Sequence, residues 1–266
     1  MPPPRWFLDH PAKAAEIVAR FSTPKQTSET SYATVRDYCE SLDHLPQITG
    51  LDGDLKNVQR PWAVKALLRS LPLPARILEI GGGEPIVSGF LNELGYDVTL
   101  VDPYDGFGNG PTEYERYVET FPNVKIVRGY LEPQMQAFAP GTFDAIFSVS
   151  VLEHLPMEAA EKCFRAIGEF LAPGGASIHC FDFVLQGIAQ EYDLTSARHI
   201  LAQQAQLENR PGETGFAELL ERLKADLETF YLSPQGHHHW RGGLPYEKFR
   251  FRKVVSLQTI TFRPKS

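Results

Sequence analysis

A glycine-rich turn with an acidic residue in front of it is the part of the sequence best suited to ligand chemistry. The turn Gly81–Gly83 follows the apolar run Arg76–Ile80 and precedes a helical pattern that begins at Ile86. Glycines at this point let the backbone approach a ligand at the carboxyl edge of a parallel sheet. Glu79 would repel a diphosphate, and Ile86 occupies the third glycine position of a nicotinamide-binding turn. The turn therefore favours a cationic cofactor over a dinucleotide.

A second carboxylate closes the next apolar run. Asp102 ends the pattern Val98–Asp102, one helix and one strand after the glycine turn. A carboxylate there can accept both ribose hydroxyls of an adenosine, as in binders of nicotinamide or of S-adenosylmethionine. Asp102 alone does not distinguish these cofactors. Two later patterns do so in combination with it: T-F-D-A-I-F-S at 142–148 and L-A-P-G-G at 171–175.

The elements that position these residues follow a βαβ rhythm. Between Leu73 and Phe183, short apolar runs alternate with longer amphipathic stretches. Runs so continuously apolar are typical of strands buried on both faces of a parallel sheet. We expect an α/β fold with a doubly wound, mostly parallel seven-stranded sheet. The predicted strands are 76–80, 97–101, 124–127, 143–149 and 176–181, and the predicted helices are 86–94, 111–121 and 158–171.

Two flanking segments differ from this core and look like helical caps. We divide the chain into an N-terminal cap (1–70), a cofactor-binding core (71–183), a helical insertion with a substrate loop (184–248) and C-terminal strands that complete the sheet (249–266). In the caps, helices are expected at 10–21, 31–41 and 61–70, and one long apolar stripe predicts a single helix from Phe216 to Tyr231. The alternating segment 249–262 would close the edge of the sheet.

Composition narrows the function classes. The 266 residues are 42% hydrophobic and carry 26 basic against 33 acidic side chains, a net charge of −7. This balance counts against a nucleic-acid partner, and no apolar stretch is long enough to span a membrane. We expect a cytoplasmic protein, because a secretory leader is missing and the 3 cysteines suit a reducing compartment. The tail 237–266 is basic, which fits either a solvated strand face or an anionic substrate.

In the order and spacing of these motifs, the sequence resembles the class I S-adenosylmethionine-dependent methyltransferases. The resemblance rests on E-x-G-x-G at 79–83, Asp102, the F-D-x-I-x-S strand with V-L-E-H-L after it, and L-x-P-G-G. It covers residues 73 to 183 and implies a Rossmann-like methyltransferase fold with S-adenosylmethionine as cofactor. Relatives often have an acid after the third strand for the adenine amino group, and here Gly129 is followed by Tyr130 and Leu131.

The resemblance also implies roles for individual residues. Glu79, Gly81, Gly82 and Gly83 would line the methionine end of the cofactor. Asp102 and Pro103 would hold the ribose. Around the adenine, Tyr130 and Leu131 would act through stacking and backbone groups, and Ser148 and Val149 would form the floor of the pocket.

Methyl transfer to a hydroxyl needs a base within hydrogen-bond reach, whereas an amine needs little more than orientation. His154 is the first candidate, because some small-molecule O-methyltransferases place a base at the matching point of Leu-Glu-His, with an acid such as Asp182 as partner. The alternative is that Glu153 and His154 only cap the following loop. His179 is expected to pack within the sheet.

The run His237–Arg241 supplies the remaining candidates. His239 is a further catalytic candidate, and Trp240 and Arg241 would bind substrate through an indole face and a guanidinium fork. No metal site is expected here, because adjacent histidines in an extended chain point in opposite directions. Tyr32 would belong to a lid over the site, although aromatic residues in a helical cap also serve packing.

The sequence therefore predicts a methyltransferase that uses S-adenosylmethionine to methylate a hydroxyl of a small polar acceptor, a sugar or another secondary metabolite. The alternatives are N-methylation, nucleic-acid methylation, or a cofactor-binding module without catalysis. A small-molecule acceptor is the expected partner, with neither nucleic acid nor membrane, and the sequence leaves a homodimer open.

Overall fold

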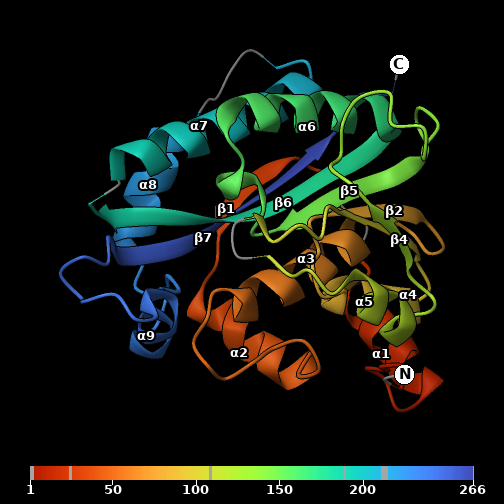
Figure 1. The fold of residues 1–266 in the computed structure, drawn as a ribbon, viewed down its shortest axis with the longest axis horizontal. Helices are drawn as coiled ribbons and strands as arrows, with labels where there is room; N and C mark the ends of the chain where they lie inside the picture. The colour runs from red at the N-terminus through yellow and green to blue at the C-terminus, as the bar shows by residue number, and fades with distance from the viewer. Residues whose placement is uncertain (1–2, 24–25, 108–109, 189, 211–214, 266) are drawn as a thin grey trace.

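The structure is a computed structural model that describes residues 3–23, 26–107, 110–188, 190–210 and 215–265 (Figure 1). Helices cover a central sheet on both faces. The strands are β1 (Glu29–Tyr32), β2 (Arg76–Ile80), β3 (Asp97–Asp102), β4 (Lys125–Arg128), β5 (Phe143–Val149), β6 (Leu171–Gly187) and β7 (Phe251–Phe262). The helices are α1 (Pro11–Phe21), α2 (Val35–His44), α3 (Lys56–Ser70), α4 (Ile86–Glu93), α5 (Tyr114–Thr120), the 3₁₀ helix η2 (Leu152–His154), α6 (Met157–Phe170), α7 (Gln190–Leu207), α8 (Phe216–Ala225) and α9 (Pro234–Arg241).

The sheet has seven strands in the order β1-β7-β6-β5-β2-β3-β4. The five strands from β6 to β4 run parallel, and β7 and β1 are antiparallel to their neighbours. The chain order reverses between β2 and β5, and ligands of open α/β sheets bind at the carboxyl ends of the strands beside such a reversal. The predicted α/β class and the mostly parallel seven-stranded sheet are confirmed.

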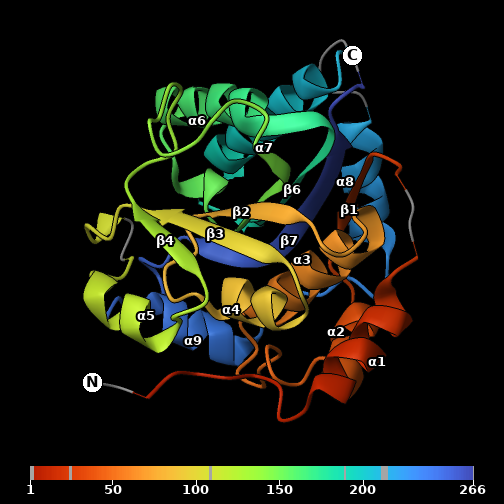
Figure 2. The ribbon, with the colours of Figure 1, turned by 90° about the vertical axis from the view of Figure 1, so that its right-hand side faces the viewer.

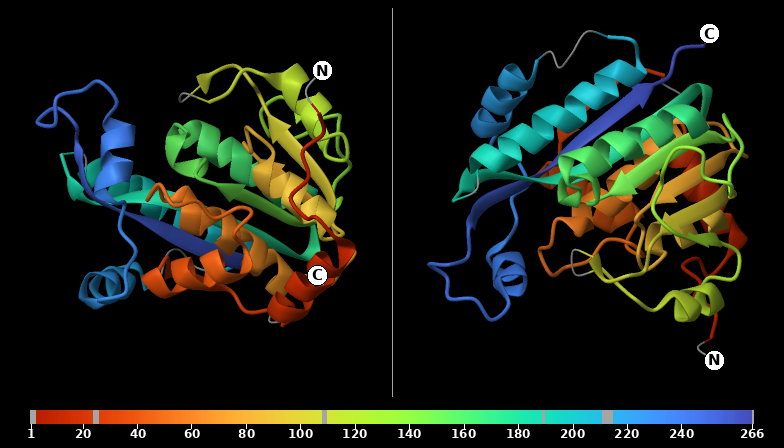
Figure 3. Two further views of the ribbon diagram at one scale, coloured as in Figure 1. Left: turned by 90° about the horizontal axis from the view of Figure 1, so that it is seen from below. Right: turned by 45° about the horizontal axis from the view of Figure 1, so that its top comes forward.

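Each face of the sheet is covered by its own hydrophobic core. One core lies under α1, α3 and α4, and the other lies under α6, α7 and α8 (Figures 2 and 3). The inner parallel strands β2 and β5 are buried on both faces, which explains their continuous apolar character. No described helix is both long and apolar enough to cross a membrane.

The prediction of a helix over 31–41 is wrong in its first part. Ser31 and Tyr32 belong to β1, the edge strand that pairs with β7. The helix begins only at Val35, because Thr34 forms a capping box with Asp37: the Thr34 hydroxyl accepts the Asp37 N–H, and the Asp37 carboxylate accepts the Thr34 N–H. Consequently β7 does not close the sheet, since β1 lies outside it.

The single helix predicted from Phe216 to Tyr231 is also wrong, because α8 ends at Ala225. Leu227 is fully exposed, and Tyr231 forms an extended bridge to Val255. The Thr229 hydroxyl donates to the Leu223 carbonyl and satisfies the end of α8. Apolar residues beyond Ala225 thus matched the helical period although they lie on an extended segment that joins the sheet.

Helix α3 brings the N-terminal segment to the centre of the molecule. It contacts β5 and β6, and most of its side chains are buried. The helix begins at Lys56, five residues before the predicted start at Pro61, because Pro61 lies inside the first turns and not at the first position. The earlier start places Lys56, Gln59 and Arg60 on a helix that reaches the carboxyl edge of the sheet.

Candidate active site

A cavity of about 610 Å³ opens at the carboxyl ends of β2, β3 and β5. This volume lies in the range of small-molecule and cofactor sites. Most of the residues assigned to the cofactor line it: Glu79, Gly81, Gly82, Gly83, Asp102, Pro103, Tyr130, Leu131 and Val149. His154, Lys56 and Arg60 line it as well.

The glycine turn is held in a conformation that favours glycine. Gly81 and Gly83 have φ values of 65° and 54°, in the left-handed region. The Gly81 N–H donates to the Val101 carbonyl at 2.8 Å, which ties the turn to β3. A Cβ at Gly82 would come within 2.5 Å of Leu100 Cδ1 and 2.7 Å of Glu79 Cδ. The turn therefore brings bare backbone to the cavity wall.

Glu79 is buried behind this turn, with 2% of its surface exposed. Its Oε2 accepts hydrogen bonds from the backbone N–H of Ser88, at 3.1 Å, and from the Ser88 hydroxyl. Burial raises the pKa of Glu79 to about 7, and the bonds from Ser88 oppose the rise. A cation beside this carboxyl would favour its ionised form.

Asp102 at the end of β3 is fixed by two backbone groups. Its Oδ1 accepts the Tyr104 N–H at 2.8 Å and its Oδ2 accepts the Gly83 N–H at 3.0 Å. Burial raises the pKa of Asp102, and both N–H groups counteract that rise. Each oxygen retains a lone pair that can accept a ligand hydroxyl.

The far end of the cavity contains aromatic and acidic groups. The Tyr130 hydroxyl donates to Asp105 Oδ2 at 2.6 Å, and this bond raises the pKa of Tyr130. Phe107 lines the cavity with half of its surface exposed. Glu132 also lines it, two residues after Tyr130. This acid was not predicted from the sequence, because it lies beyond the two residues that directly follow Gly129.

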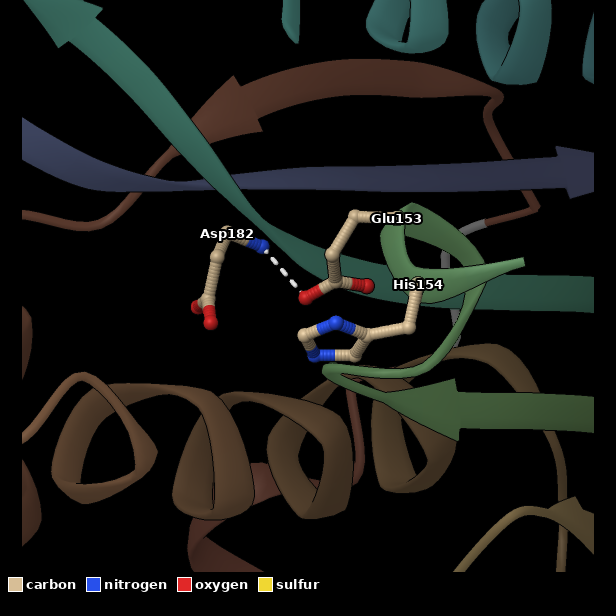
Figure 4. A group of neighbouring side chains, drawn as sticks. All are labelled: Glu153, His154 and Asp182. Atoms are coloured by element: carbon tan, nitrogen blue, oxygen red, sulfur yellow. Dashed lines mark hydrogen bonds between the residues drawn. The ribbon is translucent and has the colours of Figure 1, made fainter. Parts of the chain in front are cut away.

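Three titratable side chains meet beside the cavity: Glu153 and His154 of η2 and Asp182 of β6 (Figure 4). One ligand atom from each lies within 4.8 Å of the other two. The backbone N–H of Asp182 donates to Glu153 Oε1 at 2.8 Å, and Glu153 Oε2 is buried without a hydrogen-bond partner among the described residues. Ligand atoms at this spacing could also hold a metal ion.

Helix α3 and the end of β5 hold Asp182 in place. Gln59 Nε2 donates to Asp182 Oδ1 at 2.8 Å, and the Ser150 hydroxyl donates to Oδ2 at 3.0 Å. Ser150 has a φ of 55°, which turns the chain sharply after β5 and toward η2. These two supports were not found from the sequence, because they come from elements remote from Asp182.

The environment shifts the pKa of each member of the cluster toward its neutral form. Burial and the charge of Asp182 raise the pKa of Glu153 to about 8. Burial also raises the pKa of Asp182, against the hydrogen bond from Gln59 and the charge of Lys56. The pKa of His154 is lowered by desolvation and by Lys56, although Asp182 opposes this shift. These shifts favour the neutral imidazole of His154, which can accept a proton.

Ser148 and His179 lie within the sheet and do not line the cavity. Ser148 is fully buried, and its Oγ lies 2.7 Å from His179 Nδ1. His179 Nε2 lies 2.8 Å from Ser177 Oγ, and burial lowers the pKa of His179 to about 3. The expectation that His179 packs within the sheet is confirmed. Of the two residues expected on the pocket floor, only Val149 is in the lining.

Four residues assigned to the site lie elsewhere: Tyr32, His239, Trp240 and Arg241. The Tyr32 hydroxyl donates to Asp226 Oδ2 at 2.9 Å. The other three belong to α9, where the Trp240 indole donates to Asp54 at 2.6 Å, Arg241 donates to the Leu244 carbonyl, and His239 is exposed. The prediction of an extended chain there is wrong, because Ser233 caps a helix that begins at Pro234.

Comparison with known proteins gives partial matches and one extensive match. Two uncharacterized proteins of Mycobacterium tuberculosis, from strains H37Rv and CDC 1551, are each 32% identical over 123 residues, or 45% of this chain. The match spans 39% of the length of either relative. Among solved structures, the fold is similar to that of Haemonchus contortus phosphoethanolamine N-methyltransferase 2 in complex with S-adenosyl-L-methionine. The two chains are 17% identical, and the superposition covers 97% of this chain and 75% of the other, with a TM-score of 0.47.

A TehB-like S-adenosylmethionine-dependent methyltransferase from Corynebacterium glutamicum is 21% identical over 62% of this chain and 82% of its own, with a TM-score of 0.41. The extensive match is to a family sequence profile described as a methyltransferase domain. That profile aligns with residues 54–259, well over half of the chain. The aligned region contains α3, the glycine turn, Asp102 and the Glu153–His154–Asp182 cluster.

Proposed function

Because the chain belongs to the methyltransferase domain family, we propose that it transfers the methyl group of S-adenosylmethionine to a hydroxyl of a small polar acceptor, a sugar or a secondary metabolite. S-adenosylmethionine supplies a methyl group activated by a sulfonium. The observation that carries the hydroxyl assignment is the neutral His154 on the cavity wall, with Asp182 in the same cluster.

The charges of the cavity fit this cofactor. Glu79 would face its ammonium group, and the bare backbone of Gly81–Gly83 lets the methionine end lie close. Asp102 would accept the ribose hydroxyls through its unused lone pairs. Arg60 is the cation on the methionine side and would pair with the cofactor carboxylate.

At the other end of the cavity, His154 would take the proton of the acceptor hydroxyl while the oxygen–carbon bond forms and the sulfur–carbon bond breaks. Asp182 would stabilise the resulting imidazolium, since its charge raises the pKa of His154. Gln59 and Ser150 keep Asp182 oriented for this role. A cavity that encloses both cofactor and acceptor would align them for methyl transfer and exclude water.

Thermal unfolding in the presence of S-adenosylmethionine, S-adenosylhomocysteine, NAD and NADP tests the cofactor. A ligand at one hundred times its dissociation constant adds about 2.7 kcal/mol to the free energy of unfolding. We expect a higher melting temperature with the first two compounds alone. A shift with NAD, or with none of the four, would contradict the cofactor assignment.

Substitution of the base tests the acceptor class. With a hydroxyl acceptor, His154→Ala is expected to lower kcat by about 100-fold or more, because the proton loses its acceptor. His238→Ala, on the exposed face of α9, is the control. Radiolabelled methyl transfer at pH 6 to 9 measures both. A His154→Ala enzyme that keeps its rate across this range would point to an amine acceptor.

A further inference from the structure

Two cations on α3 face the cavity. Lys56 and Arg60 are four residues apart on the helix, so they lie on the same face, and both line the cavity. Gln59 of the same turn reaches Asp182. The first turn of α3 therefore extends along the cavity from the glycine turn to the acidic cluster.

Neither cation has a partner. Within the part of the chain that the structure describes, no hydrogen bond or ion pair is formed by the Lys56 ammonium or the Arg60 guanidinium. Other cations near the cavity do have partners: Lys162 pairs with Glu158, and Arg5 pairs with Glu84. Arg60 is half-buried, and the carboxylates of Asp54, Glu84, Glu79 and Asp52 act on it electrostatically. Lys56 is exposed. Either cation can therefore bind an anionic group of a ligand.

The two cations belong to different ends of the cavity. Arg60 interacts electrostatically with Asp54, which lies just before α3, and with Glu84 and Glu79 at the glycine turn. Lys56 interacts with His154 and Asp182 instead. Arg60 thus lies at the cofactor end and Lys56 at the acceptor end.

The position of Lys56 then constrains the acceptor. S-adenosylmethionine carries one carboxylate, which Arg60 would bind. Lys56 forms no ion pair among the described residues, and its charge acts on His154, the residue that would receive the acceptor proton. We propose that the acceptor carries an anionic group, a carboxylate or a phosphate, which the Lys56 ammonium binds while the reacting hydroxyl lies at His154. This inference rests on the proposed function.

The pairing also fits the chemistry of the cluster. The positive charge of Lys56 disfavours a proton on His154, and a bound anion would screen that charge. The acceptor would thereby improve the base that activates it. A neutral acceptor would gain no ion pair with Lys56 and would leave the charge of this lysine acting on the imidazolium.

The test uses the complete protein saturated with S-adenosylhomocysteine, so that Arg60 is occupied. Calorimetric titrations with benzoate, inorganic phosphate and the neutral benzamide are compared for the wild type, Lys56→Met and Lys65→Met. Lys65 is the matched control, because it lies on the same helix but pairs with Glu40 and does not line the cavity.

We expect benzoate or phosphate to bind the wild type at least about tenfold more tightly than benzamide, and Lys56→Met to weaken that anion at least about tenfold. Lys65→Met should stay within about twofold, and all three proteins should bind S-adenosylhomocysteine equally. Which anion binds distinguishes a carboxylate acceptor from a phosphate acceptor. Equal binding of benzamide, no binding of either anion, or an unchanged Lys56→Met variant would overturn the proposal. A wild type that fails to bind S-adenosylhomocysteine would instead overturn the proposed function itself.

Discussion

The cofactor end and the acceptor end of the cavity differ in how their polar groups are satisfied. At the cofactor end, Ser88 holds Glu79, and the N–H groups of Gly83 and Tyr104 hold Asp102. All of these partners are groups of the protein itself, held by β2, β3 and α4 and the loops that follow the two strands. The cofactor end is therefore preorganised, which lowers the entropy cost of binding.

At the acceptor end, fewer polar groups are paired within the described residues. There the Lys56 ammonium forms no ion pair, Glu153 Oε2 is buried without a hydrogen bond, and His154 is exposed at the cavity. The groups come from α3, η2 and β6, which are far apart in the sequence. Changes at the cofactor end should therefore alter ligand affinity, and changes at the acceptor end should alter turnover and its pH dependence.

The largest effect is expected at Asp102. Asp102→Ala removes the acceptor of the ribose hydroxyls and leaves two buried N–H groups without their partner. Hydrogen bonds to a charged group are worth about 1.5 to 3 kcal/mol each, so the affinity for S-adenosylhomocysteine should fall about 100-fold or more. Calorimetry measures the loss. Asp97→Ala, at the exposed start of the same strand, is the control. Equal affinities of the two variants would contradict a preorganised cofactor end.

Glu79 should make stability depend on pH. Its pKa is raised from 4.5 to about 7 in the folded protein, so the folded state binds more protons than the unfolded state between these values. The free energy of unfolding contributed by Glu79 therefore falls as the pH rises through this window, by roughly 3 kcal/mol. Glu79→Gln should lose less stability than the wild type between pH 5 and pH 8 in urea unfolding. Glu153 titrates in the same direction and remains in both proteins. Parallel pH profiles would show that Glu79 does not titrate in this range.

The same contrast explains what the sequence could and could not predict. The glycine turn, Asp102 and their strands are contiguous patterns, so local rules locate both the elements and the cofactor residues. Gln59, Lys56 and Ser150 join Asp182 only through tertiary packing, and no spacing in the chain indicates it. Two local signals were misjudged: Pro61 suggested the start of α3, and Ser233 before Pro234 was not recognised as a helix cap. Because the helix was expected to start at Pro61, Lys56 and Arg60 were not recognised as cavity residues. Because the cap at Ser233 was missed, Trp240 was assigned to the site.

A smaller effect separates the two cations of α3. Arg60→Met should weaken S-adenosylhomocysteine about tenfold, because one charge-assisted contact to the cofactor carboxylate is lost. Lys56→Met should leave that affinity within about twofold, since Lys56 lies at the acceptor end. Fluorescence or calorimetric titration compares the variants side by side. Equal weakening by both substitutions would mean that both cations bind the cofactor carboxylate. That result would contradict the assignment of Arg60 to the cofactor end and Lys56 to the acceptor end.

The smallest effect is expected in the pH profile of methyl transfer. Asp182 raises the pKa of His154 and Lys56 lowers it, while Glu153 titrates in the same cluster. Loss of the Lys56 charge in Lys56→Met should raise the pKa of His154, so the neutral base forms only at higher pH. The acid limb of kcat should then move upward by a few tenths of a pH unit, because solvent screens a charge on an exposed side chain. Lys65→Met should leave the limb in place. A downward shift of the acid limb, or a shift of equal size in both variants, would show that Lys56 does not act on His154. The acceptor end would then lack the electrostatic coupling that we expect to distinguish it from the cofactor end.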